Sequence, residues 1–146
     1  MIDDNRRKTS RFRIEQAKEC LETAIAALDF SINTAANRSY YSIFHSMRAV
    51  LALEGFDSKK HSGVISYFRR NYIKTKKFDP FFSDAIGNAF SIRSNSDYMD
   101  FYILQKSDVM EQIENAKLFL EATEKYIAQL PMKEIGEMED MGEQED

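Results

Sequence analysis

The sequence predicts an all-α protein, folded as an antiparallel up-and-down bundle of four to five helices. Apolar residues recur at intervals of three and four through most of the chain, which is the spacing that places them on one face of a helix. No segment alternates apolar and polar residues between turn signals, as a half-buried strand would. Helices of about 15–25 residues joined by short loops favour antiparallel packing against their neighbours.

Length and composition limit the classes of protein to which the chain can belong. The 146 residues are 43% hydrophobic and 30% charged, with five Gly and two Pro. These values indicate one globular domain and exclude collagen-like, low-complexity and wholly disordered proteins. The longest aliphatic run, Ala49–Leu53, is too short to span a membrane, and the start of the chain lacks the apolar region of a signal peptide. Because the single Cys20 cannot form an internal disulfide, we expect a soluble cytoplasmic protein with no membrane association.

Two long helices are expected in the first third of the chain. The first carries an apolar stripe with spacings of three and four residues, formed by Ile14, Ala17, Leu21, Ala24 and Leu28. Asn33 and Thr34 are expected to cap a second helix, which runs to about Glu54 and ends at Gly55. The apolar face of this second helix contains Tyr40, Phe44, Met47 and Leu51.

Three further helices are expected in the rest of the chain. Ser58 begins a third, shorter helix that carries Val64, Ile65 and Phe68. Asp79 and Pro80 begin a fourth, because Asp caps a helix and Pro at the first helical position loses no needed hydrogen bond. Ser107 and Asp108 begin the fifth, and Pro131 ends it. The apolar stripes of the last two helices are Phe82, Ile86, Ala89 and Phe90, then Ile113, Ala116, Leu120, Thr123, Ile127 and Leu130.

Charge divides the chain into three parts. Residues 1–10 form a basic N-terminal segment, residues 11–130 form the helical body, and residues 131–146 form a tail with seven acidic residues and one lysine. The tail has too few apolar residues to offset the entropy of ordering, so we expect it to be mobile. Within the body, residues 59–77 hold seven basic residues and no acidic one. This segment suits either a polyanionic partner or a solvated helix and loop.

Four polar side chains of the second helix form the first candidate binding group: Arg38, Tyr41, His45 and Arg48. At about 100° per residue they fall within an arc of about 80° beside the apolar face. Arg supplies fixed donors to a phosphate, and His exchanges a proton near neutral pH, so the group suits a phosphate or a nucleotide. The structural alternative is that Tyr41 and His45 border the core while both arginines are solvated.

The second candidate group is Arg93 with Asp97. Arg93 continues the middle of the apolar stripe of the fourth helix, and a buried guanidinium needs either a partner or a groove. Asp97 can reach it from the next helical turn. Two interpretations remain open: an ion pair that ends the helix, or a polar notch that receives a phosphate.

The sequence predicts no metal site and no cofactor. The chain has two histidines, His45 and His61, and it lacks a cysteine cluster, a His-Glu-x-x-His motif and a glycine-rich phosphate loop. His61 follows Lys59 and Lys60 near the start of the third helix, where backbone amides and positive charge suit an anion. A surface histidine with no ligand is the ordinary alternative.

Three segments, taken together, resemble one branch of the HEPN superfamily, the small stand-alone HEPN-domain proteins. Residues 36–51 read ANRSYYSIFHSMRAVL and closely resemble the signature of this branch. Residues 60–65, and residues 93–102 with Arg93, Asp97 and Tyr98, resemble its other motifs in the same order. The resemblance covers about residues 11–130. It implies a bundle of four or five helices that forms a homodimer and pairs with a minimal nucleotidyltransferase in a toxin–antitoxin-like system.

The resemblance also implies an activity, because many HEPN proteins are metal-independent endoribonucleases with an Arg-x(4–6)-His motif. In such a site His assists proton transfer at the ribose 2′-hydroxyl, and Arg stabilises charge on the phosphorus. This chain departs from the usual pattern, since Asp97 stands after Arg93 where His is expected. Arg38 and His45 satisfy the spacing, but on the second helix.

The sequence is therefore consistent with three functions. The first is a HEPN protein that binds nucleotide or RNA beside a nucleotidyltransferase partner, with the ligand held by Arg38, Tyr41, Arg48, His61, Asp97 and Tyr98. The second adds RNA cleavage, with His45 and Arg93 as catalytic residues in a site shared across the bundle. The third is a non-catalytic dimerisation or protein-interaction module in which Arg93 and Asp97 form a structural pair. Ile43 and Val50 lie outside the narrow apolar stripe, so we expect an uncovered surface that favours a homodimer.

Overall fold

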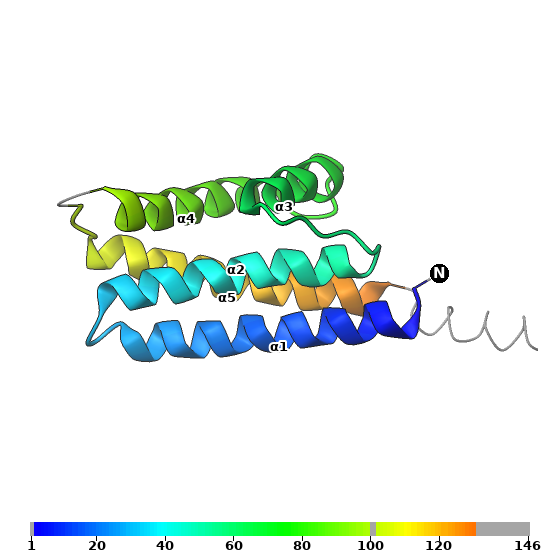
Figure 1. The fold of residues 1–146 in the computed structure, drawn as a ribbon, viewed down its shortest axis with the longest axis horizontal. Coiled ribbons are helices and arrows are strands. Elements are labelled where there is room, and N and C mark those ends of the chain that lie inside the picture. The colour runs from blue at the N-terminus through cyan, green and yellow to red at the C-terminus, as the bar shows by residue number, and fades with distance from the viewer. Residues whose placement is uncertain (1, 100–101, 131–146) are drawn as a thin grey trace, which may run out of the picture.

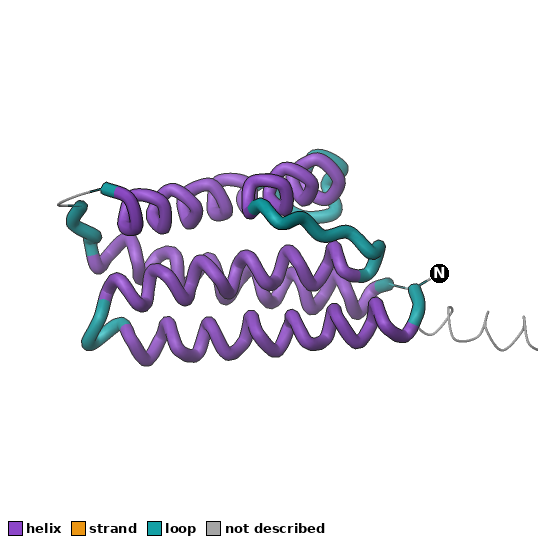
Figure 2. Tube along the Cα trace, viewed as in Figure 1, coloured by secondary structure: helices purple, strands orange, loops and turns teal. Residues whose placement is uncertain are grey.

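Every regular element of the protein is helical over residues 2–99 and 102–130, the residues that the computed structural model describes. The helices are α1 (Asp4–Ala27), α2 (Ile32–Ala52), α3 (His61–Phe68), α4 (Phe81–Tyr98) and α5 (Lys106–Gln129), with a π-helical turn at Arg69–Ile73. Each long helix runs antiparallel to the long helix before it, and the short α3 leads into α4 (Figures 1 and 2). The predicted all-α antiparallel bundle is confirmed. The acidic tail, residues 131–146, lies outside the described residues.

The contact between α1 and α2 is made by small side chains. The buried residues of this contact include Ala17, Ala24, Ala27, Ala35, Ala36 and Ala49. The Ser10 hydroxyl donates to the carbonyl oxygen of Ala49 at 2.7 Å, and the Ser42 hydroxyl donates to that of Ala17 at 2.9 Å. Because small residues at a contact let two helix axes approach closely, α1 lies directly against α2. This packing brings the side chain of Arg13 to the C-terminal half of α2.

The main core lies between α2, α3, α4 and α5. Tyr40, Met47, Phe68 and Phe119 are each 1% exposed or less, and aromatic rings fill much of the space around them. Ile43 and Val50 are also only 1% exposed within a single chain. The expectation that they leave an uncovered surface is therefore wrong, because α2 is the central helix and is covered on most of its circumference. No helix of the described residues is both long enough and apolar enough to cross a membrane.

The ends of the helices differ from the prediction in several places. Ser31, rather than Asn33 or Thr34, caps α2, because its hydroxyl accepts a hydrogen bond from the Thr34 amide at 3.2 Å. The N-cap of α5 is Gln105 without a side-chain bond, so the predicted start at Ser107 and Asp108 is wrong. Asp79 accepts from the Phe81 amide at 2.8 Å just before α4, but Pro80 is the N-cap and the helix begins at Phe81, one residue later than predicted. The basic segment of residues 1–10 is not separate from the bundle, since residues 4–10 form the first turns of α1.

A sharp turn at Gly55 ends α2 and reverses the chain. The Phe56 amide donates to the Leu51 carbonyl at 3.0 Å, and Gly55 has a φ of +77°. Such a turn favours glycine because other residues are strained at positive φ. A side chain at Gly55 would also meet the guanidinium of Arg6 at 2.8–2.9 Å. The reversal matters for the site, since it returns Asp57 to the side of Arg48.

Candidate functional site

One face of α2 gathers arginine, histidine and aromatic side chains from four parts of the chain. We call it the α2 face and define it by Arg38, Tyr41, His45 and Arg48 of α2, with Arg13 of α1, Asp57 and His61 near α3, and Arg93 of α4. The four α2 residues are half-buried, as their position beside the apolar stripe predicts. They neither enter the core nor point freely into solvent. Side chains from α1, α4 and the segment near α3 therefore surround these four residues without covering them.

A shared carboxylate connects the basic groups at one end of the α2 face. Asp57 Oδ2 lies 3.0 Å from Arg48 Nη2 and 3.3 Å from Arg13 Nη2. Arg13 also donates to the carbonyl oxygen of Arg48 at 3.3 Å. Although partial burial opposes it, hydrogen bonds from Arg48 and the Ser58 amide hold the pKa of Asp57 below its usual value. Two guanidinium groups thus converge on one anionic oxygen, which is an arrangement that a phosphate oxygen can also satisfy.

His45 lies among these cations as an uncharged imidazole. Burial, followed by the charges of Arg48, Arg13 and Arg38, lowers the pKa of His45 to about 4. Its Nδ1 atom is buried and has no hydrogen-bond partner among the residues that the structure describes. A neutral imidazole with an unpaired nitrogen can accept a proton, and the neighbouring guanidinium groups would stabilise negative charge formed beside it.

His61 is held against the aromatic rings of α2. The Tyr40 hydroxyl lies 2.8 Å from His61 Nδ1, and the ring of Phe44 stacks on the imidazole with 4.1 Å between centroids. Burial and the charges of Arg93 and Arg48 lower the pKa of His61, so this imidazole is also neutral at pH 7. Tyr41 packs edge-on to it at 5.7 Å. The sequence-predicted His61 therefore joins the α2 face through ring contacts.

Arg93 reaches the α2 face from α4 by lying over two rings. Its guanidinium carbon is 5.3 Å from the centre of the Tyr40 ring and 5.4 Å from that of Tyr41. Asp97 Oδ2 lies 3.6 Å from Arg93 Nε, which forms an ion pair without hydrogen-bond geometry, and Arg93 Nε is buried without a hydrogen-bond partner. The Asp97 side chain is 42% exposed. The side chain of Tyr98 lies outside the described residues.

Arg93 and His45 belong to the same face but are separated by aromatic side chains. The Tyr41 ring contacts both, with its centre 5.9 Å from that of the His45 imidazole and 5.4 Å from the Arg93 guanidinium carbon. The charge of Arg93 acts on the pKa of His61, whereas the arginines that lower the pKa of His45 are Arg48, Arg13 and Arg38. The imidazole of His45 is therefore most closely associated with arginines of α1 and α2. Arg38 completes this set, with its guanidinium 5.2 Å from the centre of the Tyr41 ring.

A hollow of about 520 Å³ opens at the end of the α2 face nearest α3. Its lining includes Arg48, Asp57, Lys59 and His61, with Phe44 as an apolar wall. Basic side chains outnumber the carboxylates here, so the hollow suits an anionic group. Among residues 2–99 and 102–130, no three His, Cys, Asp or Glu side chains lie close enough together to hold a metal ion.

Sequence reasoning did not identify Arg13 or Asp57 as members of the site. They are 44 residues apart in the chain and meet only because α1 packs against α2 and the Gly55 turn reverses the chain. The helical spacing predicts Tyr40 and Phe44 only as members of the apolar face, although both also contact His61. Their position on α2 next to the arc from Arg38 to Arg48 is the only sequence feature that indicates their place in the site.

Comparison with known proteins gives one family and several relatives. A family model described as "HEPN domain" matches residues 10–126. A UPF0332 protein of Thermotoga maritima is 34% identical over 116 residues, covering 79% of this chain and 88% of that protein. A protein of Methanocaldococcus jannaschii named "Putative toxin" is 30% identical over 115 residues, which is 78% of each chain. A second protein of that organism with the same description is 31% identical over 86 residues, covering 58% of this chain and 64% of that protein.

Proposed function

The chain belongs to the HEPN domain family, and we propose that it binds single-stranded RNA on its α2 face. The observation that carries this proposal is the convergence of Arg13, Arg38, Arg48 and Arg93 on a face lined by aromatic and imidazole rings. Single-stranded nucleic acids are bound by such combinations, because cations contact the phosphates and rings stack on the bases.

Each part of the face has a distinct role in this proposal. Arg48 and Arg13 would hold a phosphate at the position now taken by the Asp57 carboxylate, since two guanidinium groups already converge there. Lys59 and His61 line the adjoining hollow, which provides space for the neighbouring sugar or base. Arg38 and Arg93 would contact the next phosphates along the strand, because each lies over the Tyr41 ring and extends the positive surface.

A second candidate function, metal-independent RNA cleavage, is favoured by the state of His45. Its imidazole is neutral at pH 7, so an accessible ring nitrogen would be able to take the proton of a ribose 2′-hydroxyl. The 2′-oxygen would then attack the adjacent phosphorus and expel the 5′-oxygen, which is protonated from water, leaving a 2′,3′-cyclic phosphate. Arg48 and Arg38 would stabilise the charge on the phosphorus during this step. Asp97, which pairs with Arg93, would take no part in this step.

The cellular role that we propose is that of one member of a toxin–antitoxin-like pair with a minimal nucleotidyltransferase. Two M. jannaschii relatives carry the name "Putative toxin", which supports this role. We also propose a homodimer, and the surface that supports it is apolar and shared by α1 and α5. Ile25 of α1 and Met110 of α5 line one hollow there and are 46% and 49% exposed. An equilibrium mass measurement that finds only monomer at micromolar concentration would contradict the dimer.

The test of RNA binding is the affinity for a short labelled RNA, measured by fluorescence anisotropy at several salt concentrations. Three or four phosphate contacts predict a slope of log K against log salt of about −2 to −3, since each contact to a single strand contributes about −0.7. Arg48→Gln is expected to weaken binding about fivefold to tenfold and to reduce the slope by about 0.7. Its melting temperature should change little, because Asp57 keeps its partner Arg13.

Arg70→Gln is the matched control, because Arg70 is exposed and is not part of the α2 face. If Arg70→Gln weakens binding as much as Arg48→Gln does, the proposed location is wrong. If the wild-type protein retains no RNA at low salt, the protein-interaction module of the sequence analysis becomes the better account.

A further inference from the structure

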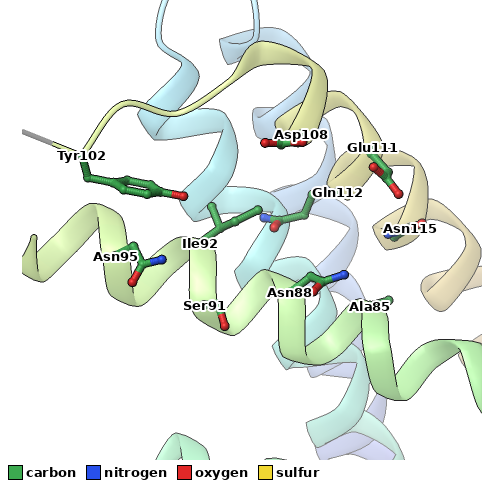
Figure 3. Close-up of a pocket in the computed structure, with 10 residues that line it drawn as sticks. All are labelled: Ala85, Asn88, Ser91, Ile92, Asn95, Tyr102, Asp108, Glu111, Gln112 and Asn115. Carbon is green, nitrogen blue, oxygen red and sulfur yellow. The ribbon is translucent and has the colours of Figure 1, made fainter.

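A second polar pocket lies between α4 and α5, away from the α2 face. It has a volume of about 330 Å³ and is rich in amide and carboxylate side chains (Figure 3). Asn88 and Asn95 come from α4, and Asp108, Glu111, Gln112 and Asn115 come from α5. Tyr102 lies at one end of the pocket, on the segment that leads into α5 (Figure 3). None of the residues that line it is basic.

The pocket is on the opposite side of α4 from the α2 face. At about 100° per residue, Asn88, Ser91 and Asn95 point within about 60° of one another along α4. Arg93 points about 170° away from the middle of this arc, toward Tyr40 and Tyr41. A ligand held between α4 and α5 therefore does not share side chains with the proposed RNA site.

Gln112 lines this pocket, and its side chain carries a buried acceptor atom that no described residue pairs with. The residue is only 4% exposed, and its side-chain nitrogen donates to the Ala36 carbonyl at 2.9 Å and to the Ser39 hydroxyl at 2.7 Å. Because the Ala36 carbonyl can only accept, the amide cannot be turned over without losing that bond. The oxygen Oε1 is therefore fixed in place, and within residues 2–99 and 102–130 it has no hydrogen-bond partner. A buried amide oxygen of this kind calls for a donor.

The carboxylates that line the pocket indicate that this donor carries a positive charge. Asp108 and Glu111 are exposed carboxylates on successive turns of α5, and the remaining polar groups are neutral amides and hydroxyls. An ammonium group supplies several N–H donors together with the opposite charge. We propose that this pocket binds a small organic ammonium of the alkyl diamine or polyamine class. One N–H would pair with Gln112 Oε1, and Asp108 and Glu111 would balance the charge.

Titration of the isotopically labelled full chain with putrescine tests this site by NMR. The side-chain amide resonances of Gln112, Asn88 and Asn115 are expected to shift together and to saturate, with a dissociation constant of about 1 mM or lower. Tetramethylammonium provides the comparison, because it carries the same charge per group but has no N–H donor. It is expected to leave the Gln112 resonance unmoved at concentrations where putrescine saturates.

A double variant tests the role of the carboxylates without disturbing Gln112, which also holds α5 against α2. Asp108→Asn with Glu111→Gln is expected to weaken putrescine binding about tenfold, because it removes both opposite charges. Glu121→Gln is the matched control, since Glu121 is an exposed carboxylate of α5 outside the pocket. The proposal is overturned if putrescine produces no saturable shift, if tetramethylammonium shifts Gln112 equally, or if the double variant binds as the control does.

Discussion

Two arginine-containing motifs, one on α2 and one on α4, resemble each other in sequence but differ in structure. On α2, Arg38 and Arg48 contact groups from α1 and from the turn before α3, and Arg93 of α4 lies over the neighbouring Tyr41 ring. On α4, Arg93 has one carboxylate partner, Asp97, four residues away on its own helix and 3.6 Å distant. The position of the motif in the bundle, rather than its spacing, determines how many groups converge on it.

The reason for this difference is the place of each helix. α2 is central, so a polar residue beside its apolar stripe lies where three other elements meet. The C-terminal end of α4 lies at one end of the bundle (Figure 1), where fewer elements are available to surround Asp97. The polar side chains that converge in this bundle are therefore gathered on α2, with Arg93 added from α4. The following predictions test whether α2, rather than α4, carries the functional groups.

The largest expected effect concerns cleavage, if the purified protein cuts RNA in the presence of EDTA. His45→Ala is expected to reduce the cleavage rate at least about 100-fold, because general base catalysis contributes about that much or more. Asp97→Asn is expected to keep most of the rate, since this exposed carboxylate has no role in the step. The measurement is the cleavage rate of each variant, after its circular dichroism spectrum has shown a native fold. The opposite order would place the chemistry on α4.

A smaller effect is expected on stability as the pH falls. The pKa of His45 is about 4 in the folded protein and near 6.5 in the unfolded chain. Between these values the unfolded chain binds a proton that the folded protein does not, so the free energy of unfolding falls as the pH falls. With allowance for solvent screening, the loss between pH 7 and pH 5 is about 1 kcal/mol. Urea unfolding of the wild type and of His45→Gln measures it, and an equal loss in both would contradict the burial of His45 among cations.

The smallest effect is expected from Asp57→Asn. This carboxylate occupies Arg48 and Arg13, so it competes with an RNA phosphate for the same donors. Its removal is expected to raise RNA affinity about twofold to threefold, because one exposed charge in water is worth little. The anisotropy assay described above measures this change. A loss of affinity in Asp57→Asn would mean that Asp57 orients the arginines rather than competing for them.

Much of the fold and part of the site follow from the sequence. The stripe through Tyr40, Phe44 and Met47 predicts both the core face of α2 and the arc on which Arg38, Tyr41, His45 and Arg48 lie, because helical periodicity is a local property. Helix ends are less well predicted, as Ser31 and Gln105 show, since several capping residues compete within a few positions. The π-helical turn at Arg69–Ile73 carries no local signal at all.

The parts of the site that could not be predicted are those that depend on tertiary contacts. Arg13 and Asp57 join the α2 face through the close packing of α1 and through the Gly55 turn, which no spacing rule relates to each other. The neutral state of His45 has the same origin. Its pKa depends on burial and on arginines of two helices. Neither the burial nor these neighbours can be predicted from the residues next to His45 in the sequence.

The measurement that most directly tests the central claim compares two charge-matched double variants. Arg38→Gln with Arg48→Gln removes two positive charges from the α2 face, and Lys74→Gln with Lys76→Gln removes two exposed charges from the basic segment of residues 59–77. The first pair is expected to weaken RNA binding about 50-fold and the second less than about threefold at the same salt concentration. Equal losses would show that RNA responds only to net charge and would contradict a binding site on the α2 face.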